Sequence, residues 1–149
     1  MDIAVLLLAL LLPRSPLSSL SPQGEITLDP CTLVAKADVE QIVGKMKGNP
    51  KSQQNGRARV CQYEAANGTD FLDVWLYPSN NLERFRKDAP NPTSVSGIGQ
   101  EAFVAHNTRF EQVQLLARKG NTLLQVVLTD SKSAEDKVKA IARKAIERL

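Results

Sequence analysis

The sequence predicts an α+β domain in which an antiparallel sheet of about five strands is packed by three helices. Two pairs of alternating apolar segments are separated by short turn signals, Asn67-Gly68 and Gly120-Asn121, which are typical of β-hairpins. The C-terminal segment instead carries an apolar stripe with helical period. Because hairpins join antiparallel strands, we expect the order α-β-β-α-β-β-β-α and no parallel nucleotide-binding sheet.

The N-terminal segment differs in composition from the rest of the 149-residue chain. Residues 3–12 are all apolar, which is typical of a secretory signal peptide and too short to span a bilayer. Residues 13–24 are rich in Pro and Ser and favour an extended, accessible segment. We therefore expect residues 1–24 to be a signal peptide and linker and residues 25–149 to be a single α+β domain outside the cytoplasm, secreted or periplasmic. A buried N-terminal helix is the alternative.

The first half of this domain predicts one helix and two strands. Apolar residues recur at helical spacing over residues 31–43, and Gly44 follows as a helix stop. Residues 45–59 are basic, contain Gly, Pro and Asn-Gly and show no apolar period, which predicts a loop. Residues 60–64 and 71–77 then alternate around the first turn signal and predict a hairpin.

The second half begins with a short helix over residues 80–88, which Pro90 and Pro92 end. Gly97 and Gly99 predict a turn with unusual backbone angles before a strand over residues 101–105.

Residues 110–119 and 122–129 predict the second hairpin. The last helix, for which Ser133 is a candidate N-cap, is predicted by apolar residues on a single face: Val138, Ile141, Ala142, Ala145, Ile146 and Leu149.

Cys31 and Cys61 are the only two cysteines. In an exported domain an even pair of cysteines favours a disulfide, which would close a loop of about thirty residues. A nucleophilic cysteine is the alternative, and it requires a base, for which the sequence offers only His106. Two unlinked buried thiols are the third alternative.

Few residues point to catalysis. With 2 Cys and 1 His the composition excludes most zinc, iron–sulfur and haem sites, and we expect neither a metal nor a cofactor. Gly97 and Gly99 lack the third glycine of a dinucleotide-binding loop, and no G-x-S-x-G motif of a serine hydrolase is present. Whether the protein is an enzyme is left open, with a non-catalytic role favoured. The alternative is a secreted hydrolase that uses His106 or carboxylates brought together by the fold.

One strand carries apolar residues on both faces. Phe71, Trp75 and Tyr77 alternate with three aliphatic residues over residues 71–77. The pattern favours burial of both faces under helices. If the aromatic face is open instead, it is a candidate binding surface for a peptide or a small apolar ligand.

The last helix is flanked by basic residues. Their apolar stems can cover the edges of the buried stripe while the charges stay in water, and this solvated arrangement is the favoured interpretation. The functional alternative is contact with an anionic envelope surface, although the formal net charge is only +3. Nucleic acid is not expected as a partner, because the few aromatic residues are not interleaved with basic ones. The candidate contact residues are Lys137, Lys139, Arg143, Lys144 and Arg148.

Short motifs also resemble a known family. They are Asp29-Pro30-Cys31-Thr32-Leu33-Val34, Ala37-Asp38-Val39, Cys61-Gln62-Tyr63 and Val95-Ser96-Gly97-Ile98-Gly99-Gln100-Glu101-Ala102-Phe103. Together they are similar to the domain-of-unknown-function 3558 family of secreted and lipoprotein domains from actinobacterial envelopes. The resemblance implies an extracytoplasmic domain in which Cys31 and Cys61 match the two cysteines of the family.

The sequence therefore favours a secreted, non-catalytic binding or interaction domain of the cell envelope. Its partner would be a protein or a small-molecule ligand that the sequence does not identify. A structural protein held at an anionic envelope surface is a further alternative.

Overall fold

The computed structural model describes residues 24–129 and 134–149. Residues 1–23, with most of the predicted signal peptide and linker, and the candidate cap Ser133 lie outside the described residues.

The described chain forms one antiparallel sheet of seven strands in the order β1-β2-β3-β7-β6-β5-β4. The central pair is β3 and β7, in which Trp75 lies opposite Gln125. The strands are β1 (Lys51–Asn55), β2 (Ala58–Glu64), β3 (Phe71–Tyr77), β4 (Thr93–Val95), β5 (Glu101–Asn107), β6 (Gln112–Lys119) and β7 (Thr122–Thr129).

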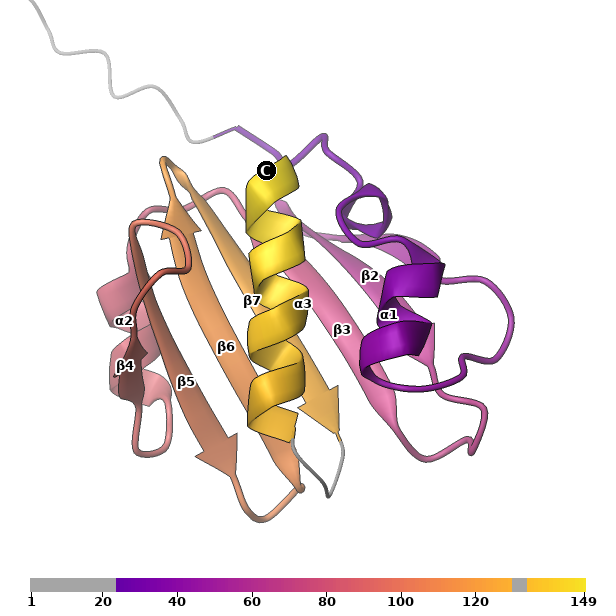
Figure 1. Ribbon diagram of the computed structural model, residues 1–149. Helices are drawn as coiled ribbons and strands as arrows, with labels where there is room; N and C mark the ends of the chain where they lie inside the picture. The colour runs from indigo at the N-terminus through magenta and orange to yellow at the C-terminus, as the bar shows by residue number, and fades with distance from the viewer. Residues whose placement is uncertain (1–23, 130–133) are drawn as a thin grey trace, which may run out of the picture.

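The helices cover the two faces of the sheet unequally (Figure 1). The 15-residue helix α3 crosses the centre of one face, and α1 lies beside it over β2 and β3. The short helix α2 lies on the opposite face, near β5 and β6. The helical elements are η1 (Pro30–Thr32, a 3-10 turn), α1 (Lys36–Ile42), α2 (Leu82–Asp88) and α3 (Ala134–Arg148).

The α+β class, the antiparallel sheet and the three helices are confirmed, but the predicted strand count and element order are wrong. Residues 45–59, predicted as a loop, contain β1 and the start of β2. Every residue of β1 is exposed, so it has no apolar alternation to detect. Its strand conformation follows from pairing with β2, where Gln53 lies opposite Val60. The other additional strand, β4, is a three-residue edge strand.

The first predicted helix is divided into η1 and α1. The side chain of Asp29 accepts a hydrogen bond from the backbone N–H of Cys31, and Pro30 begins the 3-10 turn. Leu33 and Val34 are then both almost completely buried. Adjacent residues point in directions about 100° apart on a helix, so one continuous helix lying on the sheet would not bury both side chains equally. The chain bends instead, and α1 begins after Ala35 in an extended conformation.

The larger core lies between the sheet and helices α1 and α3. On α3 it includes Val138, Ile141, Ala142 and Ala145, which confirms the predicted buried stripe. A second, smaller core lies under α2 on the opposite face and contains Leu82, Phe103, Ala105, Leu116 and Leu123. The two faces of the sheet are thus packed separately, and among the described residues the core of the second face lies around α2.

A candidate ligand-binding groove beside α2

The predicted aromatic surface lies on the face of the sheet that α2 partly covers. The alternating residues Leu72, Val74 and Leu76 are buried against the opposite core. On the aromatic face, Phe71 is 46% exposed, whereas Trp75 and Tyr77 are half-buried. Burial under helices on both sides, which the sequence favours, is therefore reached only near α2. A short helix cannot cover a seven-stranded sheet, so the rest of this face stays open among the described residues.

Helix α2 is held on the sheet by its apolar side and by one arginine. Leu82 is buried in the smaller core, and the ring of Phe85 lies 5.1 Å from that of Tyr77. The guanidinium of Arg86 lies over the ring of Phe103 at 4.8 Å and pairs with Glu101 at 3.4 Å. These contacts fix the helix from the β5 side.

The first turn of α2 is fixed by an N-terminal cap and carries one exposed arginine. The side chain of Asn81 caps the helix by accepting a hydrogen bond from the backbone N–H of Arg84. Arg84 is exposed and has no ionic partner among the described residues. Its charge is therefore accessible to the solvent and is not paired with an acidic group of the described residues.

Trp75, Tyr77 and Phe85 form a continuous row of aromatic rings. Trp75 and Tyr77 are two residues apart on β3 and so point to the same side, where their rings stack at 5.8 Å with planes 10° apart. Phe85 continues the row with its ring plane tilted by 54° from that of Tyr77. Phe71 is separate from this row and lines a small cavity of about 160 Å³ near Lys47 and Glu64. The predicted aromatic surface is therefore divided: Trp75 and Tyr77 belong to the row, and Phe71 lines the separate small cavity.

A chain of polar side chains runs across the sheet from this row. The hydroxyl of Tyr77 donates to Oε1 of Gln125 at 2.8 Å, and Nε2 of Gln125 donates to Oε1 of Gln114 at 2.8 Å. The amide nitrogen of Gln114 is left without a partner among the described residues. It is a hydrogen-bond donor available at the edge of α2.

Two cavities beside α2 share Arg84 and Phe85 in their linings, and we call the two together the α2 groove. The larger, of about 610 Å³, is lined by Tyr77 and Phe85, by Arg57 and Arg84, and by the polar side chains of Asn55, Ser79, Asn80 and Asn81. The smaller, of about 440 Å³, is lined by Gln114, Leu116 and Asp88 together with Arg84 and Phe85. Both volumes are within the range of small-molecule sites, roughly 300 to 1,000 Å³.

The ionisable groups on this face are perturbed by burial. Burial raises the pKa of Asp73, and a hydrogen bond from Gln62 opposes this change. Burial also raises the pKa of Tyr77 to about 12, with a smaller contribution from the nearby charge of Asp73. Tyr77 is therefore a neutral hydrogen-bond donor at any physiological pH, which keeps the amide chain in one direction.

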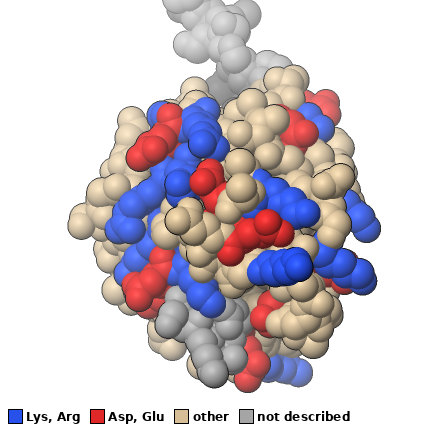
Figure 2. Space-filling view, turned by 45° about the vertical axis from the view of Figure 1, so that its right-hand side comes forward, with Lys and Arg blue, Asp and Glu red and all other residues tan. Residues whose placement is uncertain are grey.

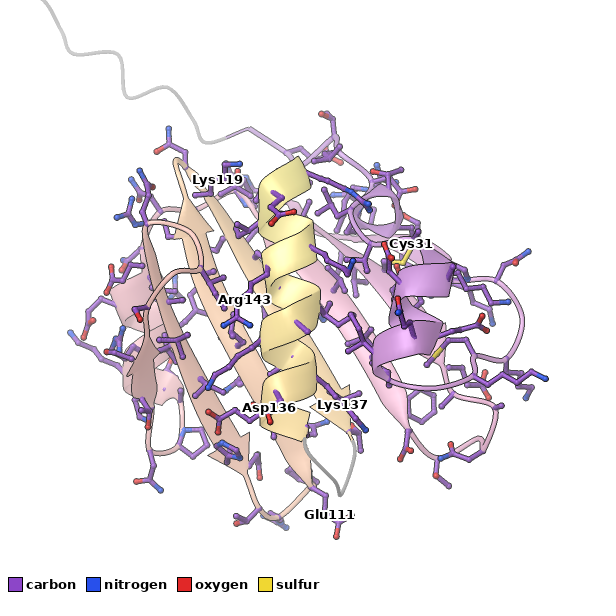
Figure 3. All side chains as sticks on the ribbon, in the orientation of Figure 1. Cys31, Glu111, Lys119, Asp136, Lys137 and Arg143 are labelled. Atoms are coloured by element: carbon purple, nitrogen blue, oxygen red, sulfur yellow. A yellow bond between two sulfur atoms is a disulfide. The ribbon has the colours of Figure 1, made fainter. Side chains whose placement is uncertain are left out.

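The cysteines are joined to each other. Cys31 and Cys61 form a disulfide of 2.03 Å that links η1 to β2 beside the larger core (Figure 3). The predicted disulfide is confirmed, and neither the nucleophilic thiol nor the pair of unlinked thiols is present in this structure. Tyr63 reinforces the same region, because its hydroxyl donates to the carbonyl of Val34 at 2.7 Å.

His106 lies on the face of α3, away from the groove. Its Nε2 is 2.8 Å from a carboxylate oxygen of Glu135 near the start of α3, and Lys139 donates to the other oxygen. Hydrogen bonds from Lys139 and then from His106 lower the pKa of Glu135. The exposed imidazole thus helps to hold the helix to β5, and His106 is not in the lining of either cavity of the groove.

The basic residues of α3 are largely paired within the domain. Lys144 and Arg148 both contact Asp38 of α1, at 3.4 and 3.7 Å, and Lys139 pairs with Glu135. Figure 2 shows Lys and Arg next to Asp and Glu over much of this face. Arg143 is exposed on one flank of α3, and Lys137 lies near its N-terminal end (Figure 3). These pairs lower the net charge that α3 presents to an anionic surface.

The described residues contain neither a cluster of metal-ligating side chains nor a helix that could span a membrane. No group of three His, Cys, Asp or Glu side chains there is arranged to hold a metal ion. Within the same residues, no helix has the length and apolar character needed to cross a bilayer.

The known proteins give little guidance for this chain. No family model matches the sequence, and no curated protein matches it. The fold is similar to the crystal structure of a GTP binding regulator from Thermotoga maritima, with 12% identity and a TM-score of 0.43 over 84% of this chain and 93% of that chain. This similarity is too distant to bear on function, so the groove is interpreted from its own residues.

Several groove residues are not among the predicted site residues. Arg57, Arg84 and Gln114 carry no motif, and Gln125 interrupts an otherwise apolar strand. Alternation along residues 122–129 could have placed Gln125 on a face opposite Leu124 and Val126, as a polar position in a central strand. Nothing local in the sequence connects the two arginines to one cavity.

Proposed function

We propose that the protein is an exported, non-catalytic binding domain of the cell envelope that holds its ligand in the α2 groove. The observation that carries this proposal is that two cavities beside α2 share Arg84 and Phe85 in their linings. There an aromatic floor meets polar side chains that have unused hydrogen-bonding capacity. Such a combination of apolar floor and few directed polar groups is typical of ligand sites.

The placement of the reactive side chains supports binding without catalysis. Cys31 and Cys61 are consumed by the disulfide, and His106 pairs with Glu135 on the other face of the sheet. The α2 groove therefore contains arginines, amides and aromatic rings, with Asp88 as the acidic side chain of the smaller cavity. These groups bind and orient a ligand well but supply no activated nucleophile.

The disulfide supports the export part of the proposal. Disulfides persist in oxidising compartments and are rare in the cytosol. This agrees with the apolar segment over residues 3–12, which precedes the described residues. Membership of the domain-of-unknown-function 3558 family stays a prediction carried by the short motifs around Cys31, Cys61 and Gly99.

The test is a ligand screen read by nuclear magnetic resonance on the oxidised, isotope-labelled protein. Small solutes of different classes are added in turn: neutral sugars, sugar acids, sugar phosphates, nucleotides, fatty acids and short peptides. We expect at least one class to shift the amide signals of Tyr77, Arg84 and Gln114 while those of α3 stay unchanged. The side-chain amide signal of Gln114, which lines the groove, and that of its hydrogen-bond partner Gln125 give a second readout.

Two variants with the same change of charge make the result specific. Arg84→Gln removes a cation from the groove, and Arg143→Gln removes an exposed cation from α3 on the other face. The proposal requires the first variant to weaken the response and the second to leave it unchanged. If every class leaves the groove signals in place, or if the signals that move belong to α3, the proposed site is wrong.

A further inference from the structure

The polar groups of the α2 groove are distributed unevenly between its two cavities. The charged side chains that line the larger cavity are Arg57, from the turn between β1 and β2, and Arg84, from α2. Among the described residues, no acidic side chain lines that cavity. The smaller cavity carries Asp88 as well as Arg84, so its charges balance. The larger cavity is therefore complementary to an anionic group, and the smaller one to a neutral part of the same ligand.

Arg84 is suited to hold such an anion. Its guanidinium has no ionic partner among the described residues. Within the same residues the guanidinium of Arg57 makes one weak hydrogen bond, 3.5 Å long, to the carbonyl of Gly24. A guanidinium binds carboxylate or phosphate oxygens through two parallel hydrogen bonds. By contrast Arg86, the neighbouring arginine on α2, is already used by Glu83, Glu101 and Phe103.

The remaining polar groups fit hydroxyl groups. Asn55, Asn80 and Ser79 line the larger cavity, and the free amide nitrogen of Gln114 lines the smaller one. Amides and hydroxyls both donate and accept hydrogen bonds, which matches a ligand that carries many hydroxyls. A fatty acid or another mainly apolar ligand would form no hydrogen bonds with these groups.

The aromatic floor fits the apolar face of a sugar ring. Tyr77 and Phe85 are tilted by 54° and lie 5.1 Å apart, so they form an angled floor and not a parallel slot. A flat nucleobase is best held between parallel rings, whereas a puckered pyranose presents C–H groups that pack on an open aromatic surface. The volume of about 610 Å³ also exceeds the space that a free inorganic anion needs.

From these features we infer that the α2 groove binds an anionic saccharide, a sugar that carries a carboxylate or a phosphate. The anionic group pairs with Arg57 and Arg84 in the larger cavity. The sugar rings rest on Tyr77 and Phe85, and their hydroxyls reach Gln114 and Asp88 in the smaller cavity. This inference rests on the proposed function, because it names the ligand class of the same groove.

Calorimetric titration of the oxidised protein tests the inference with defined probes. They are a glucuronic-acid disaccharide, glucose 6-phosphate, the matched neutral disaccharide cellobiose, inorganic phosphate and adenosine monophosphate. We expect one or both anionic sugars to bind at least about tenfold more tightly than cellobiose, the factor that one charge-assisted hydrogen bond supplies. The preference should shrink as salt is raised, because exposed charges are screened. The anionic sugar that binds more tightly shows whether the groove prefers a carboxylate or a phosphate.

Three variants connect the affinity to the assigned residues. Arg84→Gln and Arg57→Gln should each weaken binding of the anionic sugar about tenfold and leave the affinity for cellobiose unchanged. Arg143→Gln, with the same loss of charge on the other face, should change neither affinity. Circular dichroism confirms that the variants are folded, and no large effect on folding is expected because all three arginines are exposed.

Four outcomes would overturn the inference: equal affinity for neutral and anionic sugars, tighter binding of adenosine monophosphate, phosphate alone binding as well as the sugar phosphate, or equal losses in Arg84→Gln and Arg143→Gln. The ligand screen by nuclear magnetic resonance distinguishes a failure of this inference from a failure of the proposed function. If sugars fail but another class moves the groove signals, the groove binds a different ligand. If no class moves them, both proposals fail.

Discussion

The hydroxyl of Tyr77 donates a 2.8 Å hydrogen bond to Oε1 of Gln125, a residue 48 positions further along the chain. This contact couples the aromatic row of the α2 groove to its amide chain. Because Oε1 of Gln125 accepts the hydrogen bond from Tyr77, the Nε2 of Gln125 donates to Oε1 of Gln114. The amide nitrogen of Gln114 then faces the groove. The orientation of the Gln114 amide, which lines the smaller cavity of the groove, is thus set by a tyrosine on another strand.

The first prediction concerns this hydroxyl. Tyr77→Phe should lower ligand affinity about fivefold, the factor that corresponds to one hydrogen bond of about 1 kcal/mol, because Gln125 and Gln114 are then free to reverse their amides. Tyr63→Phe is the matched control. It removes the buried 2.7 Å bond to the carbonyl of Val34 and should lower stability without changing affinity. Calorimetry and urea denaturation measure the two effects, and equal affinity losses in both variants would contradict the role of Tyr77.

The second prediction concerns stability in alkali. Tyr63 and Tyr77 are the only two tyrosines, and burial raises the pKa of each from 10.0 to about 12. Since the unfolded chain ionises first, this contribution to stability is complete below pH 10 and is lost as the pH rises towards 12. An absorbance titration at the tyrosinate band should therefore show almost no ionisation at about pH 10.5 in the folded protein. Half-ionisation of either tyrosine near pH 10 would show that it is not buried as described.

The third prediction concerns the disulfide. Replacing both cysteines, Cys31→Ala with Cys61→Ala, should lower the free energy of unfolding by about 3 kcal/mol, because the loop of 30 residues is no longer closed in the unfolded chain. Reducing the wild type with dithiothreitol should lower stability by a comparable amount and should leave the double variant unaffected. Alkylation followed by intact-mass analysis of the oxidised protein checks the bond directly, and the recovery of two labelled thiols would refute it.

The fourth prediction concerns the turn before β5. Gly97 and Gly99 both have positive φ, at 78° and 63°, so alanine is strained at either position by about 1 to 2 kcal/mol. At Gly99 an added Cβ would also lie 2.5 Å from the backbone carbonyl oxygen of Arg118, whereas at Gly97 it would meet open space. Gly99→Ala should therefore be the more destabilising variant by a further ~1 to 3 kcal/mol. Thermal unfolding of the two variants measures the difference, and equal losses would contradict the close approach.

Local patterns predict a large part of this fold. The stripe of α3, the hairpin of β6 and β7 and the alternation of β3 are visible because each depends on side chains a few positions apart. By contrast, β1 is wholly polar and owes its conformation to β2, so its sequence resembles a loop. The turn over Gly97 and Gly99 is also visible, because positive φ favours glycine wherever the turn occurs.

The candidate site is only partly visible in the same way. Tyr77 is found from the alternation of one strand, but Arg57 and Arg84 come from a turn and a helix that line one cavity only in the folded chain. The packing of α2 against the sheet places Arg84 in the same cavity lining as Arg57. It depends on Phe103, Leu116 and Leu123, which come from three different strands.

The amino-acid sequence alone predicts the α+β class and the aromatic residues of β3, and it favours the pairing of Cys31 with Cys61 over free thiols. These follow from short-range periodicity and from the presence of just two cysteines. The extent to which α2 covers the second face, the direction of the amide chain from Tyr77 and the meeting of Arg57 with Arg84 arise from packing between distant segments. No local pattern encodes them, because each depends on the positions of several strands at once.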